Sequence, residues 1–278
     1  MIRLCAFDLD GTLLGADKQV SPETARAVRS LNEQGAVIAV ASARPACYTA
    51  GYLWEIGIVG IVIATNGSYV AESTGRILYE HPFPAPLLCA LTTYLTERKL
   101  GFCLLSRDGI TSSRPMEPEV LARFTRYGEM ARSHGVIVPP PEVGDLCGTL
   151  RSDILKISVF GTTEELKAEL AGIAKTFPSL SCALSSATVG DVNLAGDDKG
   201  SAVRRAAAAL GIRKEEVCCF GDYDNDIAMF REAGCAVAMG NGTAAAKEAA
   251  DFVTLSNAED GVAYAIEKIL PSYGKGAV

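Results

Sequence analysis

The sequence contains only two histidines, His81 and His134, so it offers little support for zinc binding or catalysis by imidazole. Its nine cysteines are an odd count without framework spacing, and the adjacent Cys218 and Cys219 lack the CxxC spacing of a zinc or redox site. Several of the cysteines lie inside apolar runs, where a reduced thiol behaves as a small hydrophobic group. We therefore expect buried, reduced thiols.

Basic residues are also fewer than acidic ones. Lysine and arginine total 26 against 33 aspartates and glutamates, which gives a formal net charge of −7 and a pI near 5.0. A nucleic-acid-binding protein normally carries a basic face, so this balance argues against a nucleic-acid partner.

Long hydrophobic runs are absent as well. The longest nearly unbroken apolar run covers residues 56–64 and is far shorter than the roughly 18 residues that a membrane span needs. The apolar start of the chain ends at Asp8, before the hydrophobic region of a signal peptide can develop. We therefore expect a cytoplasmic protein with no membrane partner.

Short strand-like runs recur at helix-length intervals, which is typical of βαβ units and a parallel sheet. Between the first two runs, Ser21 and Pro22 suit the start of a helix, and Gly35 suits its end. The pattern predicts an α/β protein whose core is a Rossmann-like, doubly wound parallel sheet. The runs cover residues 4–9, 36–41, 60–64, 216–220 and 236–239.

The middle of the chain follows a different pattern. Pro82, Pro84 and Pro86 crowd together, and the next hundred or so residues carry longer helical patterns, one with a capping box at Thr162 and Glu165. We interpret residues 82–188 as an inserted α/β cap domain, and residues 1–81 and 189–278 as a discontinuous core.

Two acidic segments carry the main chemical signal. Asp8 and Asp10 follow the first strand-like run, and the segment from Asp222 to Asp226 follows the fourth. Side chains at the carboxyl ends of parallel strands meet in the crevice where open α/β sheets bind ligands. Carboxylates this close repel one another unless a cation joins them, and oxygen ligands suit Mg²⁺. The sequence therefore predicts a magnesium site.

Two simpler interpretations apply to either acidic segment alone. Aspartates after strands often form turns and helix caps. A calcium loop is also compatible with the alternate aspartates of residues 222–226, but Ile227 stands where such a loop needs glycine, and Ala233 where it needs glutamate.

Two further residues suit an anionic ligand. Ser42 ends the second strand-like run, and Lys199 stands at the start of a helix, where a cation is poorly placed relative to the helix dipole. An anionic partner nearby would explain a lysine at this position. The order of these features is more specific than any one of them.

With these motifs, the chain resembles the haloacid dehalogenase-like (HAD) phosphatases, and among them the Cof-type hydrolases with a type IIB α/β cap. The resemblance implies that Asp8 is the nucleophile that forms an aspartyl phosphate, and that Asp10 is the general acid and base. It implies a Mg²⁺ cofactor held by Asp8, Asp222, Asp226 and the backbone carbonyl of Asp10.

The resemblance also implies the phosphate ligands. Ser42 and Lys199 are expected to bind the phosphate directly, and Asn225 to form hydrogen bonds around the phosphate and Lys199. Ala43 departs from the family pattern, because the family usually has glycine between the Ser/Thr and the arginine. If that glycine needs a positive φ or close contact with phosphate, alanine costs strain or room. Arg44 is a secondary candidate that contacts the substrate or pairs on the surface.

Other polar residues have simpler explanations. Asn66 follows the third strand-like run, and we interpret it as part of a plain turn. Five arginines of the insert are candidates for a second anionic group, although scattered helical arginines usually form a solvated face. They are Arg107, Arg114, Arg123, Arg126 and Arg132.

The sequence thus predicts a Mg²⁺-dependent phosphatase that hydrolyses a small phosphorylated metabolite, such as a sugar phosphate, through an aspartyl-phosphate intermediate. A phosphosugar mutase is the first alternative, and a non-catalytic protein that binds a phosphorylated ligand is the second. A mutase would not yield inorganic phosphate as its sole product. The oligomeric state stays open, because the fold does not dictate it.

Overall fold

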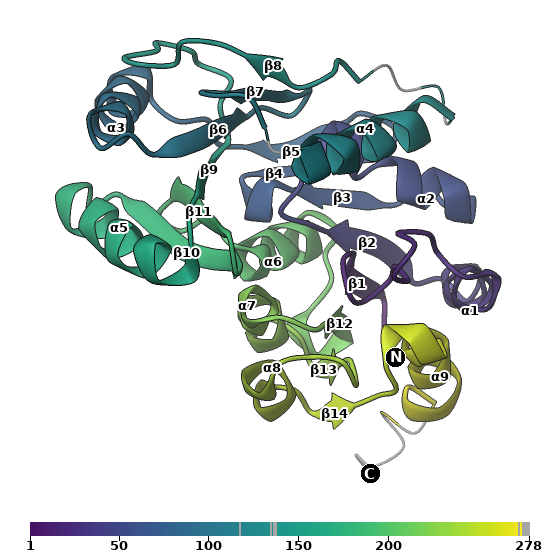
Figure 1. The fold of residues 1–278 in the computed structure, drawn as a ribbon. Helices are drawn as coiled ribbons and strands as arrows, with labels where there is room; N and C mark the ends of the chain where they lie inside the picture. The colour runs from purple at the N-terminus through teal and green to yellow at the C-terminus, as the bar shows by residue number, and fades with distance from the viewer. Residues whose placement is uncertain (117, 134, 136–137, 272, 274–278) are drawn as a thin grey trace.

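The computed structural model describes residues 1–116, 118–133, 135, 138–271 and 273, and it contains two β-sheets with helices packed on them (Figure 1). An eight-stranded sheet and its helices form the core, and a six-stranded sheet belongs to the inserted region. Within the described residues, we find no helix that is both long and apolar enough to cross a bilayer.

The core sheet has the strand order β14-β13-β12-β1-β2-β3-β4-β5. Strands β14 to β3 pair in parallel, while β4 and β5 add an antiparallel edge. All five strands predicted from the sequence are present, which confirms the α/β fold class. The strands are β1 (Leu4–Asp8), β2 (Val37–Ala41), β3 (Ile61–Ala64), β4 (Tyr69–Glu72), β5 (Ile77–Glu80), β12 (Val217–Gly221), β13 (Cys235–Ala238) and β14 (Phe252–Val253).

Helices cover both faces of the core sheet (Figure 1). The first helix begins as predicted, because the Ser21 hydroxyl accepts a hydrogen bond from the Thr24 backbone N–H and Pro22 occupies its first turn. One face carries α1 (Pro22–Glu33), α2 (Gly51–Ile56) and α9 (Gly261–Tyr264), and the other carries α6 (Lys199–Ala209), α7 (Ile227–Arg231) and α8 (Ala244–Ala249).

The second sheet has the order β10-β11-β9-β6-β7-β8. Its helix α5 starts with the predicted capping box, in which Thr162 and Glu165 bond each other's backbone N–H groups. Its strands are β6 (Gly101–Leu105), β7 (Ile110–Ser112), β8 (Glu142–Val143), β9 (Lys156–Phe160), β10 (Leu180–Ser186) and β11 (Val189–Leu194), and its helices are α3 (Ala85–Glu97), α4 (Pro118–Ser133) and α5 (Thr163–Thr176).

The two faces of this sheet differ in polarity. Ile157 and Val159 of β9 join the hydrophobic cluster formed with α3 and α5. Because side chains alternate along a strand, Lys156 and Ser158 lie on the opposite face, where they line a cavity together with Asp8 of the core. The inserted sheet therefore presents polar groups to the carboxyl end of β1.

The boundaries of the inserted domain stay a prediction. Strand β11 begins at Val189, the residue predicted to return to the core, and it pairs with β9 and β10 of the second sheet. From this sheet membership, we propose that the return to the core lies after Leu194 and not before Val189.

Candidate active site

Four of the predicted site residues converge at the carboxyl edge of the core sheet. Asp8 ends β1, Asp222 and Asp226 follow β12, and Lys199 is the first residue of α6. Since β1 and β12 are neighbours that pair in parallel, their carboxyl ends lie side by side. A cavity of about 340 Å³ opens here, and its lining includes Asp8, Lys199 and Asp222.

Lys199 lies between two of these carboxylates. Its Nζ donates hydrogen bonds to Asp8 Oδ1 at 2.5 Å and to Asp226 Oδ1 at 2.6 Å, and its side chain is 2% exposed. Burial opposes the charged form of Lys199, but Asp226 and Asp8 outweigh it and raise its pKa. The capping box of Asp198 and Ser201 starts α6 and so positions the lysine.

Asp226 is fully buried and bonded on both oxygens. Its Oδ2 accepts the backbone N–H groups of Asp222 at 2.9 Å and Tyr223 at 3.0 Å, while its Oδ1 accepts from Lys199. These bonds hold the loop after β12 in a tight turn. The predicted acidic loop therefore orients Asp226 toward Lys199 by its own backbone.

The pKa values of Asp8 and Asp222 are raised above the ordinary value of an aspartate. Burial raises the pKa of Asp8 well above its usual range; Lys199 opposes this shift, while Asp226 and Asp222 add to it. Burial and the charge of Asp226 raise the pKa of Asp222 to about 6, although Thr12 donates a hydrogen bond to Asp222 Oδ1 at 3.1 Å. Additional positive charge at this site would stabilise both ionised groups.

The carboxylates also fit a divalent cation by geometry. Asp8, Asp222 and Asp226 each offer an oxygen, and these oxygens lie within 4.8 Å of one another. Hard, all-oxygen donor sets of this kind suit Mg²⁺. Of the predicted magnesium ligands, these three side chains meet, and the fourth, the backbone carbonyl of Asp10, stays a prediction.

Gly11 permits the close approach of the two acidic segments. Its φ is +91°, and a Cβ added there would lie 2.3 Å from Asp222 Oδ2. We predict that Gly11→Ala lowers the free energy of unfolding by about 3 kcal/mol, through backbone strain and steric overlap. Gly35 is a matched control, because its φ is +97° but no atom lies within 4 Å of an added Cβ.

Urea unfolding of both variants measures the difference. Gly35→Ala should cost about 1 kcal/mol, the strain alone. Equal costs for the two variants would show that the contact between Gly11 and Asp222 is unimportant.

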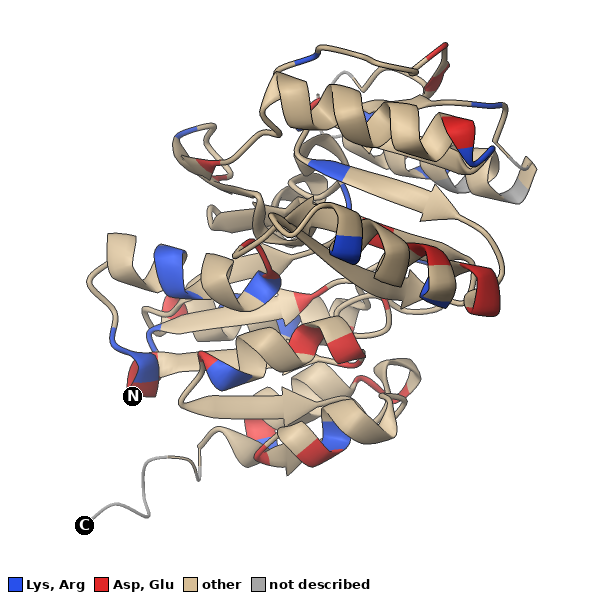
Figure 2. Ribbon diagram, turned by 90° about the vertical axis from the view of Figure 1, so that its left-hand side faces the viewer, with Lys and Arg blue, Asp and Glu red and all other residues tan. Residues whose placement is uncertain are grey.

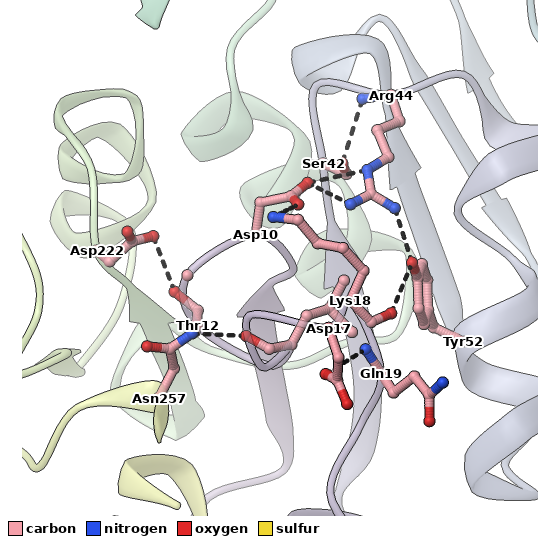
Figure 3. Close-up of polar contacts among 12 residues, drawn as sticks. Asp10, Thr12, Asp17, Lys18, Gln19, Ser42, Arg44, Tyr52, Asp222 and Asn257 are labelled. Carbon is pink, nitrogen blue, oxygen red and sulfur yellow. Dashed lines mark hydrogen bonds and ion pairs between the residues drawn. The ribbon is translucent and has the colours of Figure 1, made fainter. Parts of the chain in front are cut away.

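Asp10 is held by two cations (Figure 3). Its Oδ2 accepts from Arg44 at 2.5 and 2.9 Å, and its Oδ1 accepts from Lys18 at 2.7 Å. Partial burial alone would raise the pKa of Asp10, but Arg44 and Lys18 outweigh it and lower the pKa. The raised pKa that acid catalysis by Asp10 requires is thus not present in this arrangement.

Arg44 lines the cavity with Ser42, and its guanidinium pairs with Asp10 there and not with a residue on the surface. It is buried, donates to the Tyr52 hydroxyl at 2.9 Å, and its guanidinium lies 3.7 Å from the centre of the Tyr127 ring. Both contacts are anchored in apolar clusters, so the arginine is fixed against Asp10. The alternative of a surface pair is therefore wrong, and the contact of Arg44 with the substrate stays a prediction.

The departure at Ala43 causes no backbone strain, because Ala43 is not among the residues with positive φ. Ser42, Ala43 and Asn225 all line the cavity with Asp8. The Ser42 hydroxyl accepts the backbone N–H of Arg44 at 3.2 Å. The structure thus brings the predicted phosphate ligands Ser42 and Asn225 to one cavity.

Asn66 is part of a tight turn as predicted, with a left-handed φ of 58°. Its amide also donates to Asp191 Oδ2 of β11 at 2.9 Å, a link between the core and the inserted sheet. Sequence reasoning missed this contact, along with the roles of Lys18, Lys156 and Asp191. Lys18 pairs with Asp10 eight residues before it, and Lys156 pairs with Asp191 on the neighbouring strand of its sheet. No local motif marks either pair.

Four of the five candidate arginines of the insert do not line the cavity. Arg107, Arg114, Arg126 and Arg132 are exposed, and the side chain of Arg123 lies outside the described part of the structure. Basic and acidic residues are interspersed along the helices and loops (Figure 2). These observations favour the interpretation of the four arginines as a solvated face.

The family of haloacid dehalogenase-like hydrolases matches residues 5–266. The chain belongs to this family. Among curated relatives, YxeH of Bacillus subtilis (strain 168), provisionally named a phosphatase, is 31% identical over 97% of this chain and 99% of its own length. YcsE of the same organism, a 5-amino-6-(5-phospho-D-ribitylamino)uracil phosphatase, is 29% identical over 95% of this chain and 94% of its own.

Solved structures of this hydrolase family share the fold. A haloacid dehalogenase-like hydrolase from Bacteroides thetaiotaomicron has a TM-score of 0.82 at 25% identity, covering 97% of this chain and 100% of that one. The HAD subclass IIB sugar phosphatase BT4131 has a TM-score of 0.80 at 24% identity, with 95% and 98% covered. The resemblance inferred from the sequence motifs is confirmed.

Proposed function

We propose that this hydrolase is a Mg²⁺-dependent phosphatase that acts on a small phosphorylated metabolite through an aspartyl phosphate on Asp8. The observation that carries the proposal is the contact of one buried lysine, Lys199, with Asp8 and Asp226 beside Asp222 at the edge of the sheet. The names of the relatives support phosphatase activity.

In the first step, Asp8 attacks phosphorus through a carboxylate oxygen, and the bond from phosphorus to the alcohol oxygen breaks. A carboxylate nucleophile divides one difficult displacement into two easier steps. Lys199 stands at the nucleophile and stabilises negative charge on the phosphoryl oxygens. Ser42 and Asn225, which line the same cavity, are proposed to donate hydrogen bonds to those oxygens.

Asp8, Asp222 and Asp226 would hold the Mg²⁺ ion, together with the backbone carbonyl of Asp10. When bound, the ion offsets charge on the phosphoryl group and on the carboxylates. Because Asp8 and Asp222 have raised pKa values without such a charge, the site favours a cation.

Asp10 is proposed to protonate the leaving alcohol and then to take a proton from the water that hydrolyses the aspartyl phosphate. Its pairing with Arg44 and Lys18 favours the carboxylate, which suits the second step. For the first step, Asp10 must bind a proton, so the contact with these cations must loosen as the substrate binds.

Phosphate release from p-nitrophenyl phosphate tests the proposal. We expect turnover with Mg²⁺ and a loss of at least about 100-fold after chelation, because metal stabilisation of a phosphoryl group is worth several kcal/mol. Added Mg²⁺ should restore the rate, and chelator saturated with Mg²⁺ is the control. Equal rates without metal contradict the metal assignment, and no phosphate release in any condition contradicts the phosphatase.

A further inference from the structure

The cavity extends from the catalytic carboxylates to the inserted sheet, where three polar side chains form a buried group. Lys156 and Ser158 come from β9, and Asp191 comes from the neighbouring strand β11. Register places Asp191 directly opposite Ser158, so their side chains share one face of the sheet. All three line the cavity that holds Asp8 and Lys199.

Asp191 organises this group. Its Oδ2 accepts from Lys156 Nζ at 2.7 Å and from the Asn66 amide at 2.9 Å, and its Oδ1 accepts from the Ser158 hydroxyl at 2.7 Å. The side chains of Lys156 and Asp191 are only 4% and 2% exposed. The group is therefore rigid and preorganised, with its geometry set by two paired strands.

Hydrogen-bonding capacity is left over on the side of the cavity. The bonds described for Lys156 use one of its three N–H groups, and Asp191 Oδ1 and the Ser158 oxygen retain acceptor lone pairs. A hydroxyl group both donates and accepts one hydrogen bond, so it matches this mixture. Lys156 and Lys199 line the same cavity as Asp8, so the group shares this cavity with the proposed nucleophile.

Apolar side chains make up much of the rest of this wall, beside the small polar residues Ser185, Ser186 and Thr188. Leu105, Ile110, Phe124, Tyr127 and Phe160 line the cavity, and the rings of Phe124 and Tyr127 pack edge to face at 6.2 Å. Such a surface accepts the carbon-bearing face of a bound molecule. Polar and apolar contacts are thus available to the same ligand.

The charges of the inserted region that line this wall of the cavity balance each other. Among the described residues of the inserted region that line the cavity, Lys156 and Asp191 alone are charged, and they pair with each other. A second anionic group on the ligand would lie beside the Asp191 carboxylate without a free cation to offset it. The wall therefore favours a ligand that is uncharged apart from its phosphate.

We propose that Lys156, Ser158 and Asp191 form a subsite that binds hydroxyl groups of the leaving alcohol and selects an uncharged, hydroxylated leaving group over one with a second anionic group. The inference rests on the proposed phosphatase function. In this proposal, residues of the inserted sheet contact the alcohol part of the substrate and determine specificity. They are separate from the groups that act on phosphorus.

Three esters test the subsite through steady-state kinetics. Glucose 6-phosphate has an uncharged, hydroxylated leaving group, 6-phosphogluconate adds a carboxylate to a similar skeleton, and p-nitrophenyl phosphate has no hydroxyl group. We expect kcat/KM to be highest for glucose 6-phosphate and at least about tenfold lower for 6-phosphogluconate, the scale of one unfavourable charge contact.

Asp191→Asn removes the negative charge and leaves Lys156 without its counterion. This variant should raise kcat/KM for 6-phosphogluconate relative to glucose 6-phosphate by about tenfold, because the free ammonium then attracts the carboxylate. Ser158→Ala tests the same subsite without changing charge. It should lower the ratio of kcat/KM for glucose 6-phosphate to that for p-nitrophenyl phosphate by about tenfold.

Ser181→Ala is the matched control, because Ser181 is an exposed residue of β10 that does not line the cavity. Equal or faster turnover of 6-phosphogluconate by the wild-type protein overturns the proposal, as does an unchanged ester ratio in both Asp191→Asn and Ser158→Ala. Failure of the proposed function is distinct from these results, since then none of the three esters releases phosphate.

Discussion

Asp8→Asn is expected to lower kcat by at least about 10⁴-fold, the scale of effect seen when a covalent nucleophile is removed. The asparagine amide cannot attack phosphorus, but it fills nearly the same space beside Lys199 as the carboxylate does. Burial raises the pKa of Asp8, so its ionised form destabilises the folded protein at neutral pH in the absence of metal. The variant should therefore unfold in chelator at the same temperature as the wild-type protein or above it.

Asp17→Asn is a suitable control, because Asp17 is an exposed residue of the loop that follows β1. Phosphate release and thermal unfolding of the three proteins give the comparison. Wild-type phosphate release by Asp8→Asn would exclude the aspartyl phosphate. A large drop in its unfolding temperature would show that the charge of Asp8 supports the fold.

Lys199→Met is expected to lower both stability and activity. Loss of the ammonium leaves Asp8 and Asp226 buried without their shared cation, and breaking a buried ion pair in this way typically costs about 3–5 kcal/mol. The rate should fall by about 10³-fold, because the charge on the phosphoryl oxygens loses a buried donor. Urea unfolding in chelator and kcat with saturating Mg²⁺ measure the two effects.

A double variant separates charge from packing. Lys199→Met combined with Asp8→Asn has one unpaired carboxylate fewer, so it should recover part of the lost stability. Lys175→Met, an exposed substitution on α5, controls for the change of side chain. Wild-type stability of Lys199→Met would be incompatible with an essential buried ion pair at this site.

Arg44 shows where sequence reasoning reached its limit. The motif places it two residues after Ser42, which suggested a ligand contact or a surface pair. In the structure it binds Asp10, which is 34 residues away in the chain, and Tyr127 of α4 stacks on it. Contacts between distant segments depend on side-chain packing, and the local pattern of residues does not report it.

The inserted region shows a second limit of prediction from the sequence. The clustered prolines near Pro82 predict where it begins, and the capping box of Thr162 and Glu165 marked the start of α5. The membership of residues 189–194 in its sheet was not readable, because strand pairing joins segments that lie far apart in the sequence. The Lys156 and Asp191 pair follows from that pairing.

The sequence by itself determined the βαβ order of the core and the positions of Asp8, Lys199, Asp222 and Asp226, because hydrophobic runs define buried strands and parallel strands bring their carboxyl ends to one edge. Only the tertiary structure decided how the charges pair. Asp10 lies against Arg44 and Lys18, and Lys156 lies against Asp191. The strength of a charge interaction depends on distance and burial, and both are set only when the chain folds and these side chains pack.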